Sequence, residues 1–132
     1  MFCKIGKKEI NSKSVYEDER TLAFLDINPL AKGHTLIIPK NHATNILELT
    51  PEDLIAVFRA GQLITARLNE VFQPDGFTIG INHGRISGQA IDHFHLHIIP
   101  RFRGDGGGSL HSVVHAPPKE SLDEIWRQII KK

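Results

Sequence analysis

The chain lacks several features that define large classes of proteins. Its 132 residues include one cysteine, Cys3, so no internal disulfide can form, and a lone cysteine is typical of a reducing compartment. No segment approaches the roughly 20 apolar residues of a membrane span, and the opening MFCKIGKKEI lacks the apolar core of a secretory signal. We therefore expect a soluble, cytoplasmic protein with no membrane partner.

An excess of either charge is also missing. Sixteen lysines and arginines face fifteen aspartates and glutamates, and the short basic pairs form no continuous stripe. Because binding to a nucleic-acid polymer needs a basic surface, we expect no such partner. Sequence repeats are absent as well, and a chain of 132 residues fits one domain with a real core. We expect a single domain over residues 1–132.

Short apolar runs between turn formers predict a set of β-strands. Residues 14–16 and 21–25 flank the polar turn EDER, which is typical of a hairpin. The run HTLIIP at 34–39 predicts a buried strand after a turn-rich loop. Further on, FTIGIN at 77–82 and the segment 93–101 are joined by a loop too short for a crossover helix, so these strands should be antiparallel.

Two helices are predicted from capping residues and apolar spacing. Thr50 and Pro51 are typical of a helix start, and apolar residues then recur every three or four positions to about Phe72. Ser121 and Glu124 form a capping-box pair ahead of a second apolar stripe. The pattern predicts the α+β class, with an antiparallel sheet, one long helix and a C-terminal helix.

Histidine is the residue that the chain has in unusual number, with eight copies. Three of them, His93, His95 and His97, occupy alternate positions of HFHLHIIPR. Successive side chains of a strand point to opposite faces, so the three imidazoles should share one face while apolar neighbours share the other. Such a row could provide structural hydrogen bonds, metal ligands or the working groups of an enzyme.

Strand geometry argues against a shared metal ion. With a rise of roughly 3.3 Å per residue, the backbones of His93 and His97 lie about 13 Å apart, against a Zn–N distance of about 2 Å. A further ligand could come from His34, His42 or Cys3, but the sequence has no CxxC pair and no HExxH helix. We expect no metal at this site.

Phosphate chemistry suits the row better. Near neutral pH an imidazole can be a nucleophile, a proton carrier or a cationic partner of phosphate. The loop NHGRISGQ at 82–89 ends four residues before His93, and its glycines would let backbone amides approach an oxyanion. The pattern favours a substrate that carries phosphate and forms a covalent intermediate.

At this point the sequence resembles a known family. HFHLHII matches the alternating His-apolar signature of the histidine triad (HIT) superfamily. The segments FCKIGKKEI, VYEDERTLAFLDINPLAKGHTLIIPKNH and NHGRISGQAIDHFHLHIIPR resemble its Hint branch, from near the first residue to Arg101. The resemblance implies a two-fold homodimer of HIT domains, each with an antiparallel sheet of about five strands. The core would span about 1–101, and a C-terminal extension would span about 102–132.

The resemblance also implies an activity. Members of the family are nucleotide hydrolases and transferases that act at the α-phosphate of nucleoside monophosphate conjugates. The Hint branch prefers purine nucleoside phosphoramidates, and acyl-adenylates are related substrates. By family position, His95 resembles the nucleophile that forms a nucleotidyl-histidine, His34 and His97 resemble phosphate contacts, and His93 resembles the support of the nucleophile. Two alternatives stay open: a Fhit-like dinucleoside polyphosphate hydrolase, and a nucleotide-binding partner protein with weak catalysis.

Further positions match the nucleotide-binding residues of the family. Asp26 resembles the carboxylate that accepts hydrogen bonds from the ribose hydroxyls. Asn82, Gly88 and Gln89 correspond to the loop that holds the phosphate and the scissile region. Ala90 belongs to the same set but departs from the pattern, because Hint proteins commonly carry a serine there. The apolar slot around the base corresponds to Phe2, Ile5, Phe24, Leu25 and Ile27.

Two other departures concern the tail and a zinc site. Hint proteins often end in a Trp-Pro tail that shapes the partner's site, whereas this chain continues into a helix, so Trp126 is not equated with the family tryptophan. Some relatives bind a structural zinc through two cysteines, a later histidine and the first triad histidine. Only three of these places are matched, by Cys3, His42 and His93, and a structural zinc usually needs four ligands. We expect no zinc and no other cofactor.

Overall fold

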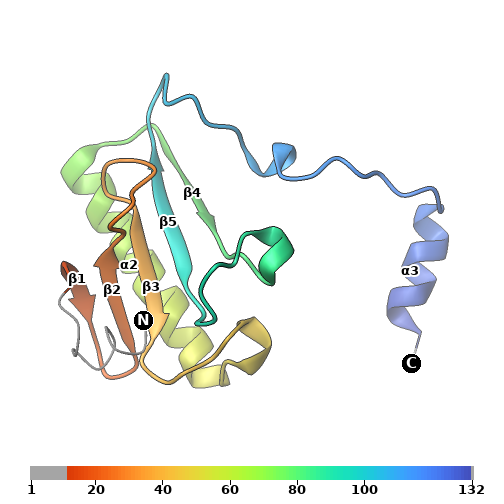
Figure 1. Ribbon diagram of the computed structural model, residues 1–132, viewed down its shortest axis with the longest axis horizontal. Helices are drawn as coiled ribbons and strands as arrows, with labels where there is room; N and C mark the ends of the chain where they lie inside the picture. The colour runs from red at the N-terminus through yellow and green to blue at the C-terminus, as the bar shows by residue number, and fades with distance from the viewer. Residues whose placement is uncertain (1–11, 132) are drawn as a thin grey trace.

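A five-stranded antiparallel sheet with one long helix on one face forms the body of the protein (Figure 1). The computed structural model describes residues 12–131. The strands lie in the order β1-β2-β3-β5-β4, and every neighbouring pair is antiparallel. The α+β class, the hairpin and the antiparallel pairing predicted from the sequence are confirmed. The strands are β1 (Ser14–Glu17), β2 (Thr21–Leu25), β3 (Thr35–Pro39), β4 (Gly76–Gly80) and β5 (Leu96–Arg101).

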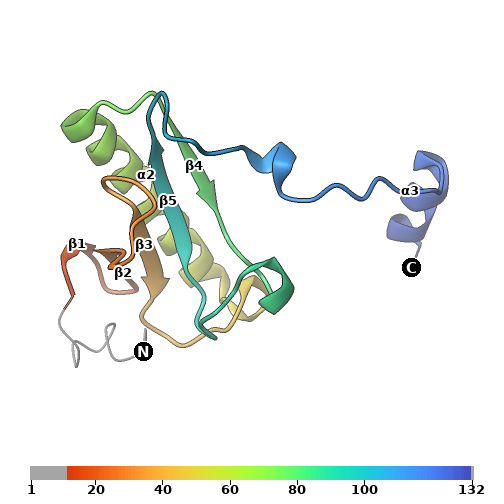
Figure 2. The same cartoon turned by 45° about the horizontal axis from the view of Figure 1, so that its top comes forward.

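The long helix α2 (Pro51–Phe72) begins where the sequence predicts. The Thr50 hydroxyl accepts a hydrogen bond from the Asp53 amide at 3.1 Å, which satisfies a first-turn donor that has no partner inside the helix. The helix runs across one face of the sheet (Figure 2). It approaches β5 closely at Gly61, where an added Cβ would lie 3.1 Å from a Leu96 methyl group.

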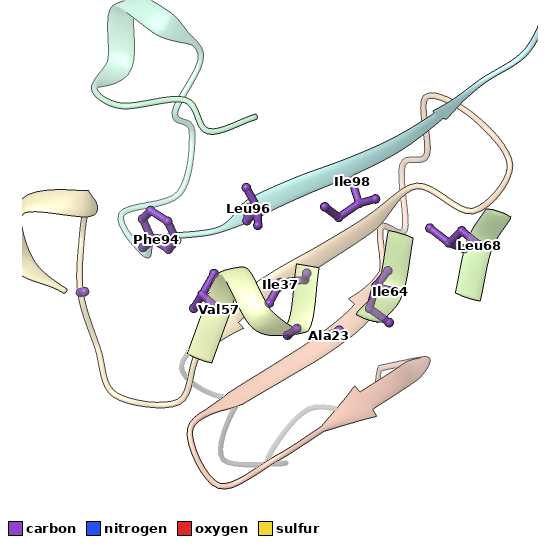
Figure 3. Close-up of a cluster of buried hydrophobic side chains, with 10 residues drawn as sticks. Ala23, Ile37, Val57, Ile64, Leu68, Phe94, Leu96 and Ile98 are labelled. Carbon is purple, nitrogen blue, oxygen red and sulfur yellow. The ribbon is translucent and has the colours of Figure 1, made fainter. Parts of the chain in front are cut away.

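The main core fills the space between α2 and the sheet (Figure 3). Its side chains come from the helix stripe and from every second residue of the strands, as amphipathic elements require. β3 is buried along its whole length because its other face is covered by a second, smaller cluster. The main cluster consists of Ala23, Ile37, Ala43, Val57, Ala60, Ile64, Leu68, Phe94, Leu96 and Ile98.

The strand predicted over 93–101 is shorter than expected. β5 begins at Leu96, so His97 is the member of the histidine row that lies within the strand. The ladder with β3 starts at the pair Ile37–Leu96, and before it the chain has no strand neighbour. Instead, the Phe94 amide donates to the Ala43 carbonyl at 2.6 Å. The alternation of faces still holds, because Phe94 and Leu96 both point into the core.

After Arg101 the chain leaves the body. We call residues 104–131 the arm; it contains a short 3-10 turn, η3 (Leu110–Ser112), and the helix α3 (Leu122–Ile130). The Ser121 hydroxyl accepts from the Glu124 amide at 3.2 Å, so the predicted C-terminal helix and its cap are confirmed. In both views the arm projects away from the sheet (Figures 1 and 2). Within residues 12–131, no helix is both long and apolar enough to cross a membrane.

Candidate active site

Three histidine rings meet on the face of the sheet opposite α2. Leu96 and Ile98 belong to the core under the helix, so His97, which lies between them, points to the other face. The His97 ring centroid lies 4.8 Å from that of His95 and 5.2 Å from that of His34, which directly precedes β3. His34 is buried and His95 nearly so. Segments separated by about 60 residues of chain thus build one imidazole cluster.

The orientation of the His95 ring is fixed by the backbone of His93. Its Nδ1 lies 2.8 Å from the His93 carbonyl oxygen, and a carbonyl only accepts hydrogen bonds, so this nitrogen carries the proton. In the neutral ring the lone pair is then on Nε2, the atom that a nucleophilic histidine needs. His93 is held in turn, because its Nε2 donates to the Pro39 carbonyl at 3.2 Å. Two successive hydrogen bonds therefore fix the nucleophile predicted from the sequence in one tautomer.

A second chain of hydrogen bonds fixes His34 and His97. The Leu30 amide donates to His34 Nδ1 at 3.1 Å, which requires the neutral ring to carry its proton on Nε2. That Nε2 lies 3.0 Å from His97 Nδ1 and donates to it. His97 must then carry its proton on Nε2, a buried atom with no hydrogen-bond partner among the described residues. A buried donor without a partner suits the acceptor atom of a ligand.

Burial keeps the His97 and His34 rings neutral. It lowers the pKa of His97 to about 4, and the neighbouring His95 and His34 rings add to the effect while Asp26 opposes it. The pKa of His34 is lowered for the same main reason, as is that of His93. At neutral pH, His97 therefore acts as a hydrogen-bond donor and not as a cation.

Asp26 lies at the edge of this cluster. One carboxylate oxygen accepts from the Asn28 amide at 2.9 Å, and the other lies 3.7 Å from His34 Nε2. Its side chain remains 18% exposed, so the carboxylate can still accept hydrogen bonds from a ligand. The structure thus brings Asp26 together with the phosphate-contact candidates.

Three of the five residues predicted to form the base slot, Phe24, Leu25 and Ile27, lie within the described residues. Phe24 packs into the smaller core cluster with Leu22, Leu36 and Ile38, so its side chain belongs to the interior. Leu25 is 36% exposed and Ile27 81% exposed, and both lie beside Asp26 in sequence. The other two predicted members, Phe2 and Ile5, lie outside the described residues.

The glycine-rich loop is braced by Gln89, whose side chain points inward. Its carbonyl oxygen accepts from the Gly84 amide at 2.9 Å, and its amide nitrogen donates to the carbonyls of Thr44 at 2.7 Å and Ile91 at 3.2 Å. The residue is 5% exposed. All these contacts are with backbone, so Gln89 holds the loop in place and does not present its amide to a ligand.

Asn82 and Gly88 lie against each other across the same loop. Gly88 has φ +111°, a conformation that L side chains rarely adopt, and an added Cβ would meet Asn82 Nδ2 at 3.4 Å. Gly84 is also left-handed, with φ +87°, and together the two glycines turn the chain around the 3-10 turn η2 (Arg85–Ser87). Ala90 follows on the surface and carries no hydroxyl.

Sequence reasoning missed the backbone groups that orient the histidines. The turn formers of DINPLAKG indicated a loop before His34, but nothing in them shows that the Leu30 amide turns toward the ring. The Pro39 carbonyl that accepts from His93 is equally invisible in the sequence. Backbone groups have no residue signature, so only the fold reveals them.

Asp26, His34 and His97 form the one group, within residues 12–131, whose side-chain atoms are close enough to hold a metal ion, all within 4.8 Å of one another. Because the Leu30 amide donates to His34 Nδ1, the neutral ring carries its proton on Nε2. This nitrogen then has no lone pair for a metal. The His42 and His93 rings, which the resemblance matches to zinc ligands of some relatives, contact each other with centroids 5.1 Å apart. The third candidate ligand, Cys3, lies outside the described residues, and the expectation of no zinc stays a prediction.

An antiparallel sheet with hydrogen-bonded imidazoles on one face and a long helix on the other defines an α+β protein built around a histidine site. The model of the HIT domain matches residues 7–104, and the chain belongs to the HIT family. The HIT-like fold is confirmed by a crystal structure of a HIT family member from Bacillus subtilis, which has 43% identity, a TM-score of 0.88 and coverage of 100% of this chain and 95% of that chain.

Other relatives differ in how much of the chain they match. An uncharacterised HIT-like protein of Methanocaldococcus jannaschii is 49% identical over 98% of this chain and 97% of its own length. The adenylylsulfatase HINT3 of Arabidopsis thaliana is 40% identical over 80% of this chain and 53% of its own length. A zinc-bound histidine triad protein from Mycobacterium smegmatis has 39% identity, a TM-score of 0.75 and coverage of 80% of this chain and 76% of that chain.

Proposed function

We propose that this protein is a Hint-like nucleotide hydrolase or transferase that attacks the α-phosphorus of nucleoside monophosphate conjugates with His95. The observation that carries the proposal is the 2.8 Å hydrogen bond from His95 Nδ1 to the His93 carbonyl, which leaves the lone pair of the neutral ring on Nε2. Neutral imidazole is a good nucleophile near neutral pH, and no metal is needed for this attack.

The reaction would proceed in two displacements. In the first, His95 Nε2 forms a bond to the α-phosphorus while the bond to the leaving group breaks, giving a nucleotidyl-histidine. In the second, water attacks the same phosphorus, the P–N bond to His95 breaks, and a nucleoside monophosphate leaves. His97 Nε2–H, a buried donor with no partner among residues 12–131, would hydrogen-bond to a phosphate oxygen as charge builds up in each step.

The remaining candidates would bind the nucleotide. Asp26 would accept from the ribose hydroxyls, since its partly exposed carboxylate borders the histidine cluster. Asn82 and Gly88 would hold the phosphate, and Gln89 would act indirectly by bracing their loop. Ala90 would border the scissile region without supplying the hydroxyl donor that Hint proteins commonly place there. We therefore expect the leaving-group preference and the rate to differ from those of Hint proteins with the serine.

The substrates we favour are purine nucleoside phosphoramidates and mixed anhydrides such as acyl-adenylates. The name adenylylsulfatase given to the Arabidopsis relative describes a mixed anhydride of AMP as substrate, which supports attack at an α-phosphate. A Fhit-like dinucleoside polyphosphate hydrolase is the alternative within enzymes. Comparing turnover of an AMP–amine conjugate with that of a diadenosine polyphosphate separates the two.

We also propose that the protein works as a homodimer. α2 exposes an unusual number of apolar side chains for a surface helix, and such a surface suits a self-complementary two-fold interface. A monomeric mass in solution at micromolar concentration would contradict this. The exposed apolar residues of α2 are Leu54, Ile55, Phe58, Leu63 and Val71.

The mechanism is tested by trapping the intermediate. Wild-type protein incubated briefly with a radiolabelled AMP–amine conjugate and quenched in alkali should carry one AMP per active chain, because phosphoramidates are stable in base. His95→Ala should carry none, while His115→Ala, a histidine of the exposed arm, should label like wild type. Equal turnover by wild type and His95→Ala would contradict the mechanism. Nucleotide binding without turnover in wild type would favour the partner-protein alternative.

A further inference from the structure

A pocket of about 210 Å³ lies beside the histidine cluster, and we call it the Ile99 pocket after the residue in its floor. Ile99 follows His97 by two positions on β5, and Ile98 between them points into the core under α2, so Ile99 and His97 share the other face of the sheet. Their Cα atoms are roughly 6.6 Å apart along the strand. The pocket therefore borders the imidazole that we propose as a phosphate contact.

The loop before β3 and the last two strands form most of the Ile99 pocket. Leu30 and Ala31 come from the loop between β2 and β3, and the Leu30 amide is the group that donates to His34 Nδ1. Thr78 and Ile99 lie directly opposite each other on β4 and β5. The loop and the start of the arm lie at the end of the sheet where β5 ends (Figure 1). The same loop thus orients a histidine and lines the pocket.

The start of the arm closes the Ile99 pocket because Arg101 holds it against β5. The Nε and Nη2 groups of Arg101 donate to the two carboxylate oxygens of Asp105 at 2.7 and 3.0 Å. Its Nη1 donates to the Gly108 carbonyl at 2.7 Å and to the Thr78 hydroxyl at 3.0 Å. Gly107 packs so closely that an added Cβ would lie 2.5 Å from Arg101 Nη2. The first residues of the arm therefore form a wall of the pocket.

The lining of the Ile99 pocket suits an uncharged apolar group. Its charges are those of Arg101 and Asp105, which neutralise each other in the paired hydrogen bonds. Four of the five N–H donors of the guanidinium already have partners within the protein, so little of its charge or bonding capacity is left for an anion. The volume of about 210 Å³ equals that of roughly seven water molecules, enough for roughly six heavy atoms. The apolar lining consists of Leu30, Ala31 and Ile99.

The order of the strands places the Ile99 pocket opposite the ribose candidate. Across the sheet, the strands lie in the order β2-β3-β5-β4. Asp26 follows β2 and His34 precedes β3. His97 lies on β5 and Thr78 on β4. A conjugate with its ribose at Asp26 and its α-phosphate at the two histidines would therefore direct its leaving group toward the pocket.

We propose that the Ile99 pocket binds the leaving group of the nucleotide conjugate and selects a short, uncharged aliphatic amine or acyl group. Because a leaving group presupposes attack at the α-phosphorus, this assignment rests on the proposed function. It narrows the substrates to AMP joined to an aliphatic amine or to an aliphatic acyl group. Conjugates that place a charge in the pocket, including dinucleoside polyphosphates, would be poor substrates, since burying an unpaired charge is costly.

Binding to His95→Ala measures the pocket without turnover. Titration calorimetry compares the AMP phosphoramidates of methylamine, of isopentylamine and of γ-aminobutyrate, which resembles isopentylamine in length but ends in a carboxylate. The isopentylamine conjugate should bind at least about tenfold more tightly than the methylamine conjugate, because its additional carbons are removed from water. The γ-aminobutyrate conjugate should show no such gain.

A variant that fills the pocket supplies the matched comparison. Ala31→Phe combined with His95→Ala should bind the two amine conjugates with equal affinity, and Ile99→Phe, which fills the same space from the floor, should act alike. Ala56→Phe introduces the same side chain on α2, on the other face of the sheet, and should keep the tenfold difference. Circular dichroism and thermal melting establish that each variant is folded.

Turnover of the same conjugates by the wild type distinguishes the pocket from the proposed function. If the wild type cleaves both amine conjugates but His95→Ala binds them equally, the pocket does not hold the leaving group, and the function stands. If the affinities differ as expected but the wild type cleaves neither conjugate, the attack by His95 fails, whereas the aliphatic subsite stands. Tightest binding of the γ-aminobutyrate conjugate would mean that Arg101 recognises an anion, and it would overturn the aliphatic selection. If none of the three conjugates binds, both proposals fail.

Discussion

The two ends of the candidate site are built differently. At the end proposed to bind phosphate, His34 and His95 are buried and His97 is partly buried, and successive hydrogen bonds fix the tautomer of each ring. At the end proposed to bind ribose, Asp26 is partly exposed and Ile27 extends into solvent. If the function proposed above holds, the groups that act on phosphate are positioned before a ligand arrives, whereas recognition of the nucleoside depends on fewer and weaker contacts. Substitutions at the two ends should therefore differ in size and in the kinetic constant they change.

The largest effect is expected at the nucleophile. His95→Gly should lower kcat/KM for an AMP–amine conjugate at least about 10³-fold, since a covalent path is lost and only binding contributions remain. Free imidazole should restore part of the rate, because His97 and the loop that bind the phosphate are still in place. A loss of less than tenfold, with no response to imidazole, would show that the phosphate end is not organised around His95.

The second effect concerns the chain of hydrogen bonds from the Leu30 amide through His34 to His97. His34→Leu removes the donor to His97 Nδ1, so His97 is free to place its proton on either nitrogen, and kcat should fall roughly 10²-fold with little change in KM. His34→Gln, whose amide can still donate, should recover part of this loss. Nitrogen-15 NMR of the imidazoles should show the Nε2–H tautomer of His97 in wild type and a mixture in His34→Leu. If His97 has the same tautomer in wild type, His34→Leu and His34→Gln, then the hydrogen bond from His34 does not set it.

The buried histidines should also make the protein sensitive to acid. The pKa of His97 is about 4 in the folded protein and 6.5 in the unfolded chain, so between these values the unfolded state binds more protons. The free energy of unfolding should therefore be greatest above pH 6.5 and fall by up to about 3 kcal/mol as the pH drops to about 4. His34 and His93 shift in the same direction and add to this loss. Urea titrations from pH 7 to pH 4.5 measure it.

His97→Asn is the control for this pH dependence. An asparagine does not titrate in this range, so the variant should lose less stability than wild type over the same interval. If both proteins lose the same free energy, burial of His97 is not the cause.

The phosphate end could be predicted from the sequence to a greater extent than the ribose end. The alternating histidines are a local pattern that predicts His95 and His97 on one face, whereas His34, which also converges on them, was indicated by the family resemblance. The packing of Phe24 against Leu36 and Ile38 could not be predicted, because it depends on strand pairing between residues distant in the sequence, and its place in the base slot stays a prediction. The start of β5 at Leu96 was missed because strand pairing depends on neighbours far along the chain.

The smallest effect is expected at Asp26. Asp26→Asn keeps the shape of the side chain and the hydrogen bond from the Asn28 amide, but a neutral amide accepts hydrogen bonds from ribose hydroxyls less strongly than a carboxylate. KM should rise about tenfold with kcat nearly unchanged, which is the signature of binding lost equally in ground and transition states. A 2′-deoxy substrate supplies the control, because wild type should lose affinity for it while Asp26→Asn should barely distinguish it from the ribose form. If kcat falls as strongly as in His34→Leu, then Asp26 affects the reaction through His34, whose Nε2 lies 3.7 Å from its carboxylate. The two ends of the site would then not function independently.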